Sequence, residues 1–246
     1  MTQGGAPLRL DQALVARGLA DSRARARALI AEGAVSVDGA PERRPARKVG
    51  AAAALAVAPA RRWVGRGALK LLHAMAAFGL SPRGASALDL GASTGGFTEV
   101  LLAEGAAAVT ALDVGRGQLH PSLRVDPRVT VVEGVNAREL RAGEVPPFDW
   151  ITADLSFISL RTALPAALAL APQGATLIAL VKPQFEAGRA AVGKGGIVRD
   201  PSAHAAACDA VAAFLREAGW DALGLTRSPI AGGDGNVEFL IAARKR

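Results

Sequence analysis

Residues 87–102 read Ala-Leu-Asp-Leu-Gly-Ala-Ser-Thr-Gly-Gly-Phe-Thr-Glu-Val-Leu-Leu, and this stretch decides the fold. A short apolar strand ends in a glycine-rich turn and a helical pattern follows, which is how an open α/β sheet presents its first ligand loop. The loop differs from the G-x-G-x-x-G loop that binds dinucleotides, because Ser93 replaces the middle glycine. Asp89 also stands just before the turn, where its charge would repel a phosphate. The loop therefore favours a ligand that carries an amine and no phosphate.

A second acid indicates that this ligand is a nucleoside. Asp113 ends the apolar strand 109–113, 22 residues after Gly91, where a carboxylate can accept both ribose hydroxyls of an adenosine. These features predict S-adenosylmethionine (SAM) as the cofactor, ahead of NAD, whereas a surface turn with an unrelated acid is the plainer alternative. The residues predicted to bind SAM are Asp89, Gly91, Ser93, Thr94, Gly95, Gly96, Phe97, Asp113, Asn136 and Asp154.

The composition bounds the class of protein. With 246 residues, half of them hydrophobic, the chain can form one large domain and a small one. A single cysteine, Cys208, excludes a disulfide framework and is typical of a reducing compartment, and the scattered histidines predict no metal site. The chain starts without an apolar signal segment, and the apolar run 51–60 is too short to span a bilayer. We therefore expect a cytoplasmic monomer with no membrane partner.

The positive charge is concentrated at one end of the chain. Residues 1–66 hold 12 lysines and arginines against 5 acids, whereas residues 67–246 hold 17 of each. A small basic unit joined to a neutral one predicts that the basic unit binds a polyanion. The alternative is a solvated, arginine-rich lobe without a binding role.

The basic end has the pattern of a small α+β domain. Leu10 and Leu14 mark a helix that ends near Gly18, a second helix is expected over 23–32, and the strand 35–37 runs into an Asp-Gly turn. Residues 9–23 read R-L-D-x-x-L-V-x-R-G-L-A-x-S-R, which closely resembles the small S-four-like RNA-binding fold. We predict this domain over residues 1–60. The residues predicted to bind RNA, in this domain and beyond it, are Arg9, Arg17, Arg23, Arg27, Arg43, Arg44, Arg66, Arg189, Lys194 and Arg199.

The remainder alternates between strands and helices. Residues 61–66 are expected to form the linker, with Trp63 docked between the two domains, and residues 67–246 to form the larger domain. The pattern predicts a doubly wound, Rossmann-like α/β sheet closed by a hairpin. The predicted elements are a helix over 68–79, strands over 86–90, 107–113, 129–133, 149–154 and 175–182, a helix over 202–218, and a final strand pair over 222–228 and 237–243.

Four charged residues are expected to meet beside the glycine loop. Asp154 and Lys182 end two apolar strands, Glu238 begins the last strand, and Lys70 lies on the helix before the first strand. Ligands bind at the carboxyl ends of parallel strands, and an antiparallel last strand would begin at that same edge. A ribose hydroxyl is a weak nucleophile that needs a base, and Lys182 is the predicted base. Four separate surface ion pairs are the alternative.

These four residues resemble the K-D-K-E set of FtsJ-type ribose 2′-O-methyltransferases. The whole chain resembles the TlyA (hemolysin A-like) rRNA methyltransferases, which join an S-four-like domain to an FtsJ-like domain. Ala68 departs from the glycine that relatives often have there. The matching segments are Arg66-Gly-Ala-Leu-Lys70-Leu, Leu88-Asp-Leu-Gly-Ala-Ser-Thr-Gly-Gly-Phe-Thr, Ala153-Asp-Leu-Ser-Phe-Ile-Ser, Val181-Lys-Pro-Gln-Phe-Glu, Gly193-Lys-Gly-Gly-Ile-Val-Arg-Asp and Ser228-Pro-Ile…Gly-Asn-Val-Glu238-Phe.

The resemblance implies methyl transfer from SAM to the ribose 2′-hydroxyl of a cytidine in 16S and/or 23S rRNA, within ribosomal subunits. It also implies an effect on sensitivity to capreomycin and viomycin. The long loop 186–200 is glycine-rich and basic, and we expect it to contact phosphates near the target nucleotide. Two other functions stay open, namely a noncatalytic RNA-binding protein that holds SAM and a membrane-active hemolysin.

Overall fold

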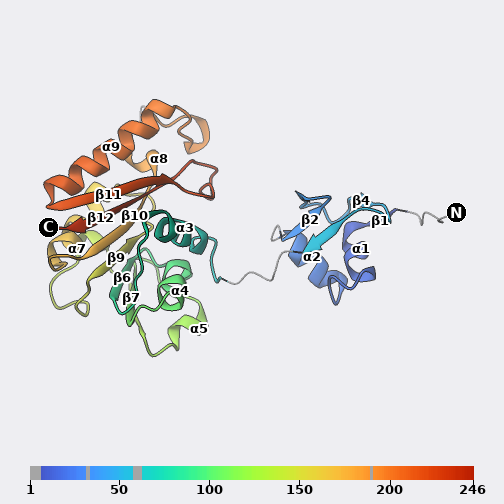
Figure 1. Ribbon diagram of the computed structural model, residues 1–246, viewed down its shortest axis with the longest axis horizontal. Coiled ribbons are helices and arrows are strands. Elements are labelled where there is room, and N and C mark those ends of the chain that lie inside the picture. The colour runs from blue at the N-terminus through green and yellow to red at the C-terminus, as the bar shows by residue number, and fades with distance from the viewer. Residues whose placement is uncertain (1–6, 32–33, 58–62, 189–190) are drawn as a thin grey trace. The chain divides into compact units, whose positions relative to one another are not determined.

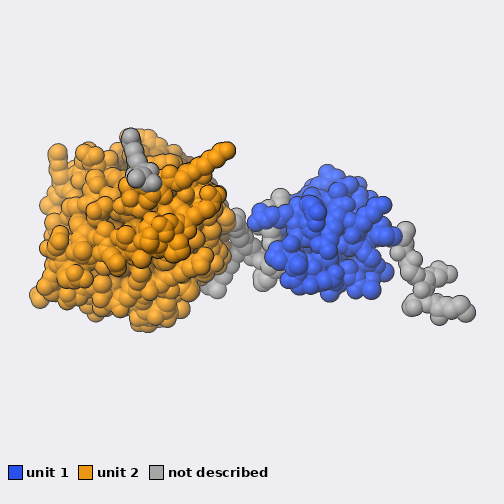
Figure 2. Space-filling model, turned by 90° about the horizontal axis from the view of Figure 1, so that it is seen from above, with its two compact units in different colours: residues 1–62 blue, residues 63–246 orange. Residues whose placement is uncertain are grey.

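The computed structural model describes residues 7–31, 34–57, 63–188 and 191–246. The chain divides into two compact units, residues 1–62 and residues 63–246 (Figure 2). The first unit contains β1 (Leu8–Arg9), α1 (Leu10–Ala16), α2 (Arg23–Ala31), β2 (Val35–Val37), β3 (Ala40–Pro41), β4 (Lys48–Val49) and β5 (Leu55–Val57).

The first unit packs its two helices over short antiparallel strands. Strand β2 pairs with both β3 and β5, and β1 pairs with β4. The predicted Asp38-Gly39 turn joins β2 to β3 with φ angles of 52° and 80°, as a two-residue type I′ hairpin turn requires. Ser22 begins α2 by accepting a hydrogen bond from the Arg25 amide. The apolar residues of both helices and β2 form one buried core, so the α+β prediction is confirmed.

The second unit is built on a seven-stranded sheet. Its strands and longer helices are α3 (Ala68–Phe78), β6 (Ser86–Leu90), α4 (Gly96–Ala103), β7 (Ala108–Asp113), β8 (Val129–Glu133), β9 (Trp150–Ala153), β10 (Thr176–Val181), α9 (Pro201–Glu217), β11 (Trp220–Arg227) and β12 (Phe239–Lys245). The shorter helical segments are α5 (Pro121–Arg124), η1 (Ala137–Glu139), α6 (Leu160–Ala163), α7 (Pro165–Leu170), α8 (Pro183–Glu186) and η3 (Lys194–Gly196).

The order of strands across this sheet is β11-β12-β10-β9-β6-β7-β8. Strands β6 to β10 are parallel, and β12 runs antiparallel between β10 and β11 (Figure 1). Because β12 is antiparallel, its beginning lies at the edge of the sheet where the parallel strands end. The predicted doubly wound sheet with a closing hairpin is confirmed.

Helices cover both faces of the sheet, and the sheet separates two hydrophobic core clusters. Alternate residues of β10 show this division, because Leu177 packs with α6, α7 and α9, whereas Ile178 packs with α3 and α4. The strands read as continuous apolar runs because both of their faces are buried. The core therefore fixes the strand ends, which carry the polar residues described below.

The segment before α3 belongs to the second unit. Trp63 and Val64 pack against the core cluster formed by α3 and α4, and the Val64 amide donates a 2.6 Å hydrogen bond to Glu99. This unit therefore begins at residue 63, within the stretch 61–66 that the sequence predicts as a linker. Residues 61 and 62 lie outside the described part of the chain. The side chain of Trp63 is partly buried against the core of the second unit.

A chain starting at residue 63 should be more stable than one starting at residue 67. The shorter chain loses the packing of Trp63 and the hydrogen bond to Glu99, which together contribute about 2 kcal/mol. Urea denaturation followed by tryptophan fluorescence measures the difference, because Trp150 and Trp220 remain in both chains. Equal free energies of unfolding would show that the packing of residues 63–66 contributes nothing.

Candidate active site

The glycine loop lies against the end of the neighbouring strand β9. Gly91 has a φ of 80°, and a Cβ atom placed there would lie 2.5 Å from the carbonyl oxygen of Asp154. Only glycine fits such a position, because it combines a left-handed conformation with a close backbone approach. Ser93 also has a positive φ, of 48°, and Gly95 precedes the first turn of α4. The close approach at Gly91 thus places Asp154, the residue after β9, beside the glycine loop.

Asp113 holds the glycine loop from the next strand. Its carboxylate accepts hydrogen bonds from the amides of Ser93, at 2.8 Å, and Gly115, at 2.7 Å. Asn136 begins the short helix η1 by accepting a bond from the Arg138 amide. These contacts fix polar groups at the ends of β7 and β8, where an adenosine is held in this class of sheet.

A cavity of about 550 Å³ opens between these strand ends. Gly91, Ser93, Asp113, Asn136 and Asp154 line it, as the sequence predicts for the SAM site. A few polar groups on an otherwise apolar wall fit a nucleoside. The lining also contains residues that the sequence analysis did not assign to the site. Leu155, Ser156, Phe157 and Ile158 lie in the family-matching segment 153–159, which could have indicated them, whereas the others show no motif: Leu112, Val114, Gln118, Val135 and Ala137.

Asp89 does not line this cavity. Its side chain is fully buried and accepts hydrogen bonds from the hydroxyls of Thr98, at 2.7 Å, and Thr152, at 2.9 Å. Burial raises the pKa of Asp89 to about 6, and the nearby charge of Asp154 adds to the rise while the threonine hydroxyls oppose it. The sequence analysis placed this carboxylate beside the ligand amine, whereas the structure turns it inward to connect β6, β9 and α4.

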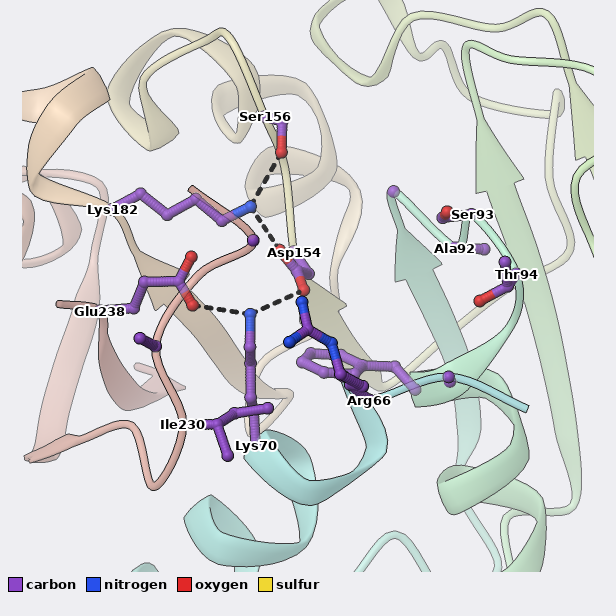
Figure 3. A pocket seen from close by; sticks show the side chains of 17 residues that line it. Arg66, Lys70, Ala92, Ser93, Thr94, Asp154, Ser156, Lys182, Ile230 and Glu238 are labelled. Carbon is purple, nitrogen blue, oxygen red and sulfur yellow. Dashed lines mark hydrogen bonds and ion pairs between the residues drawn. The ribbon is translucent and has the colours of Figure 1, made fainter. Parts of the chain in front are cut away.

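The four predicted catalytic side chains meet in one ion-pair chain (Figure 3). Lys70 Nζ lies 2.6 Å from Glu238 Oε2 and 3.6 Å from Asp154 Oδ2. Lys182 Nζ lies 2.6 Å from Asp154 Oδ1 and donates a 2.9 Å hydrogen bond to Ser156. Asp154 therefore bridges the two lysines.

The fold explains why these four residues converge. Asp154 and Lys182 directly follow the parallel strands β9 and β10, and Glu238 directly precedes the antiparallel β12. Lys70 reaches the same edge from the first turn of α3. Both lysines and Glu238 are buried, whereas the side chain of Asp154 keeps 22% of its exposure. Such charges are stable in this setting because each one has an opposite charge beside it.

A second cavity, of about 300 Å³, contains these four residues. Thr94, Gly96 and Phe97, which the sequence assigned to SAM, line this cavity, and Gly95 lines neither one. Arg66 also lines it and points toward Asp154 (Figure 3). Gly91, Ser93, Asp154 and Ser156 line both cavities, so the two sites adjoin at the end of β9.

The predicted RNA-binding residues fall into several groups. Arg9, Arg23 and Arg27 bind Asp11, Arg44 binds Glu42, and Arg17 donates to backbone carbonyls, among them Gly50 at 2.8 Å. Arg43 lies beside Glu42 and donates its amide to that carboxylate. Lys194 and Arg199 are on the loop before α9, and Arg189 lies outside the described residues.

Two kinds of feature are absent from the described residues. No helix there combines the length and apolar character needed to cross a membrane. No group of three or more His, Cys, Asp or Glu side chains in these ranges is placed to hold a metal ion.

Comparisons with known proteins agree with this geometry. Residues 63–245 match the FtsJ-like methyltransferase family, and residues 8–53 match the S4 domain. The chain is 50% identical over 239 residues to the 16S/23S rRNA (cytidine-2′-O)-methyltransferase TlyA of Mycobacterium tuberculosis, which covers 96% of this chain and 89% of that protein. It is 38% identical over 178 residues to the 23S rRNA (cytidine-2′-O)-methyltransferase TlyA of Campylobacter jejuni, which covers 72% and 69%.

A solved structure shows the same likeness. The structure, described as that of a hemolysin from Streptococcus thermophilus, matches with a TM-score of 0.75 and 40% identity, over 98% of this chain and 89% of that one. The fold and the site thus define an FtsJ-like, SAM-dependent methyltransferase with an S4 domain. Within this class, the chain belongs to the TlyA family. The family, fold class and cofactor predicted from the sequence are therefore confirmed.

The buried Asp89 should make stability depend on pH. Its pKa in the folded chain, about 6, lies above the ordinary value of 3.8, so the folded state holds a proton that the unfolded state releases between these values. The contribution of Asp89 to stability is therefore greatest at low pH and falls as pH rises through about 6. The amide of an Asp89→Asn variant would not titrate, so the variant lacks this dependence.

The free energy of unfolding of Asp89→Asn, relative to wild type, should rise by about 2 kcal/mol between pH 4.5 and pH 7.5. Urea denaturation followed by tryptophan fluorescence reports the second unit selectively, because all three tryptophans lie in it. A difference that does not change with pH would contradict the burial of an ionisable Asp89.

Proposed function

We propose that this protein transfers a methyl group from SAM to the ribose 2′-hydroxyl of a cytidine in 16S and/or 23S rRNA, with ribosomal subunits as the substrate. The observation that carries the proposal is the chain of ion pairs from Glu238 through Lys70 and Asp154 to Lys182, at the junction of two adjoining cavities. Two similar proteins are named rRNA (cytidine-2′-O)-methyltransferases, which supports the proposal.

The larger cavity is the proposed SAM site, and the smaller one receives the target nucleotide. Asp113 and Asn136 would hold the adenosine, and the loop from Gly91 to Gly96 would lie along the rest of the cofactor. When bound, SAM supplies an electrophilic methyl group. Asp154 and Ser156 line both cavities, so the residues that bind Lys182 also stand where the two substrates would meet.

Lys182 is the proposed base. Lys182 first releases a proton to solvent. Its neutral Nζ then accepts the proton of the 2′-hydroxyl as the oxygen takes the methyl group, and the carboxylate of Asp154 stabilises the ammonium that results. Lys70 contacts two carboxylates, so we assign it the role of a fixed cation that holds Asp154 and Glu238 in place. Ser156, which accepts a hydrogen bond from Lys182, orients the amine.

The basic residues are the proposed contacts to rRNA phosphates. The arginines of the first unit would hold the RNA through its phosphates, while Arg66, Lys194 and Arg199, with Arg189, would contact it near the target nucleotide. Such an enzyme would act in the cytoplasm, where ribosomes assemble. Loss of the modification would change sensitivity to capreomycin and viomycin.

Methyl transfer to purified 30S and 50S subunits tests the function. Wild-type protein with SAM should add a 2′-O-methyl group to a cytidine, which mass spectrometry of rRNA fragments locates. A noncatalytic RNA-binding protein would bind the subunits without this product. A membrane-active hemolysin would instead release dye from phospholipid vesicles.

Replacement of Lys182 should remove the reaction while leaving cofactor binding intact. Lys182→Ala should slow methyl transfer by about 10²–10⁴-fold, because the proton acceptor is lost. Lys182→Arg keeps the positive charge but is a poor base, so it should be similarly slow. Calorimetry should show SAM affinity close to that of wild type in both variants. An active Lys182→Arg protein would contradict the role of Lys182 as the base.

A further inference from the structure

Three arginines of the first unit share one buried carboxylate. Asp11 has no exposed surface, and it lies 3.1 Å from Arg9 Nε, from Arg23 Nη2 and from Arg27 Nε. The side chains of these arginines keep 41%, 51% and 56% of their exposure. One edge of each guanidinium therefore bonds to Asp11, while much of the group remains open to solvent.

The arginines come from two separate elements. Arg9 directly precedes α1, whose first turn contains Asp11, whereas Arg23 and Arg27 stand one helical turn apart on α2. Asp11 therefore connects α1 to α2 and sets the positions of three cations relative to one another. Burial disfavours the charge, but hydrogen bonds from the three arginines outweigh it and hold the pKa of Asp11 well below its usual range.

A second buried carboxylate of the first unit, that of Glu42, also binds arginine side chains. Glu42 lies 3.0 Å from Arg44 Nε and 2.7 Å from Arg47 Nη1, and it also accepts the amides of residues 43 and 44. The amide of Asp11 donates to the carbonyl of Pro45, so the two carboxylate clusters lie on adjoining segments. Two of the few acids in this basic unit are thus placed where they hold arginines.

We propose that Asp11 is a positioning residue for rRNA binding: it fixes three partly exposed arginine side chains in one array that contacts backbone phosphates. The inference rests on the proposed function, in which the first unit holds rRNA. Free arginines lose side-chain entropy when they bind, and an array fixed in advance avoids most of this cost. Asp11 therefore strengthens RNA binding by holding the arginines in place, although its negative charge by itself would repel the phosphates.

Positioning of the arginines and net charge predict opposite effects on RNA affinity when Asp11 is neutralised, so the two can be told apart. Asp11→Asn and Asp21→Asn each remove one negative charge from the same unit. Asp21 is exposed, and within the described residues its side chain forms no hydrogen bond or ion pair, so it serves as the matched control. The measurement is the dissociation constant of the full chain for purified 30S and 50S subunits, by filter binding at several salt concentrations.

If Asp11 positions the arginines, Asp11→Asn should weaken binding about tenfold, despite its added positive charge. Asp21→Asn should bind as well as wild type or slightly better. In the methyl-transfer assay, Asp11→Asn should raise KM for subunits and leave kcat and the KM for SAM unchanged. Asp11→Asn that binds as tightly as Asp21→Asn would overturn the proposal. Wild-type protein that neither binds nor methylates subunits would instead overturn the proposed function.

The fold of the first unit is checked by NMR of the methyl groups of Val35 and Val37, which are buried in its core. If the Asp11→Asn variant does not fold in this unit, the Asp11→Glu variant is compared with wild type instead. The longer side chain keeps the charge but displaces the carboxylate and its arginines. A folded Asp11→Glu protein with weakened binding supports the proposal, and wild-type affinity in that protein would overturn it.

Discussion

The carboxylate of Asp154 is the group on which the site depends. Its two oxygens face Lys182 and Lys70, and its own backbone carbonyl lies against Gly91 of the glycine loop. One residue thus connects the cofactor loop to both lysines. The parallel sheet makes this possible, because β6 and β9 are neighbours and their carboxyl ends lie at the same edge. Glu238 balances one of the two buried lysines, and Asp154 balances the other.

Much of this site could be predicted from sequence, because strand ends are visible as breaks in apolar runs. Lys182 and Asp154 each follow such a run, so the edge that they share follows from the topology rule for parallel strands. The direction of a side chain at the end of a strand is not visible in this way. Asp89 turns into the core toward two threonines, and Ser156 contacts Lys182, because of loop geometry that no residue pattern reports.

The first unit shows what charge counting can and cannot predict. The excess of arginine and lysine in residues 1–66 indicates a polyanion partner. A net-charge count, however, treats every acid in this segment as a loss of positive charge. In the structure, Asp11 and Glu42 are buried and hold arginines that remain exposed. The position of Trp63 was also hidden from sequence, since a large apolar residue before a helix fits either a linker or a packed start of the domain.

If Asp154 organises the lysines for methyl transfer, an Asp154→Asn variant should be slow in the chemical step itself. The measurement is the single-turnover rate of methyl transfer to ribosomal subunits, with SAM and subunits both saturating so that weaker binding does not affect the result. The rate of Asp154→Asn should be at least about a hundredfold lower than that of wild type, because the amide cannot stabilise the protonated Lys182. A rate within about twofold of wild type would contradict it.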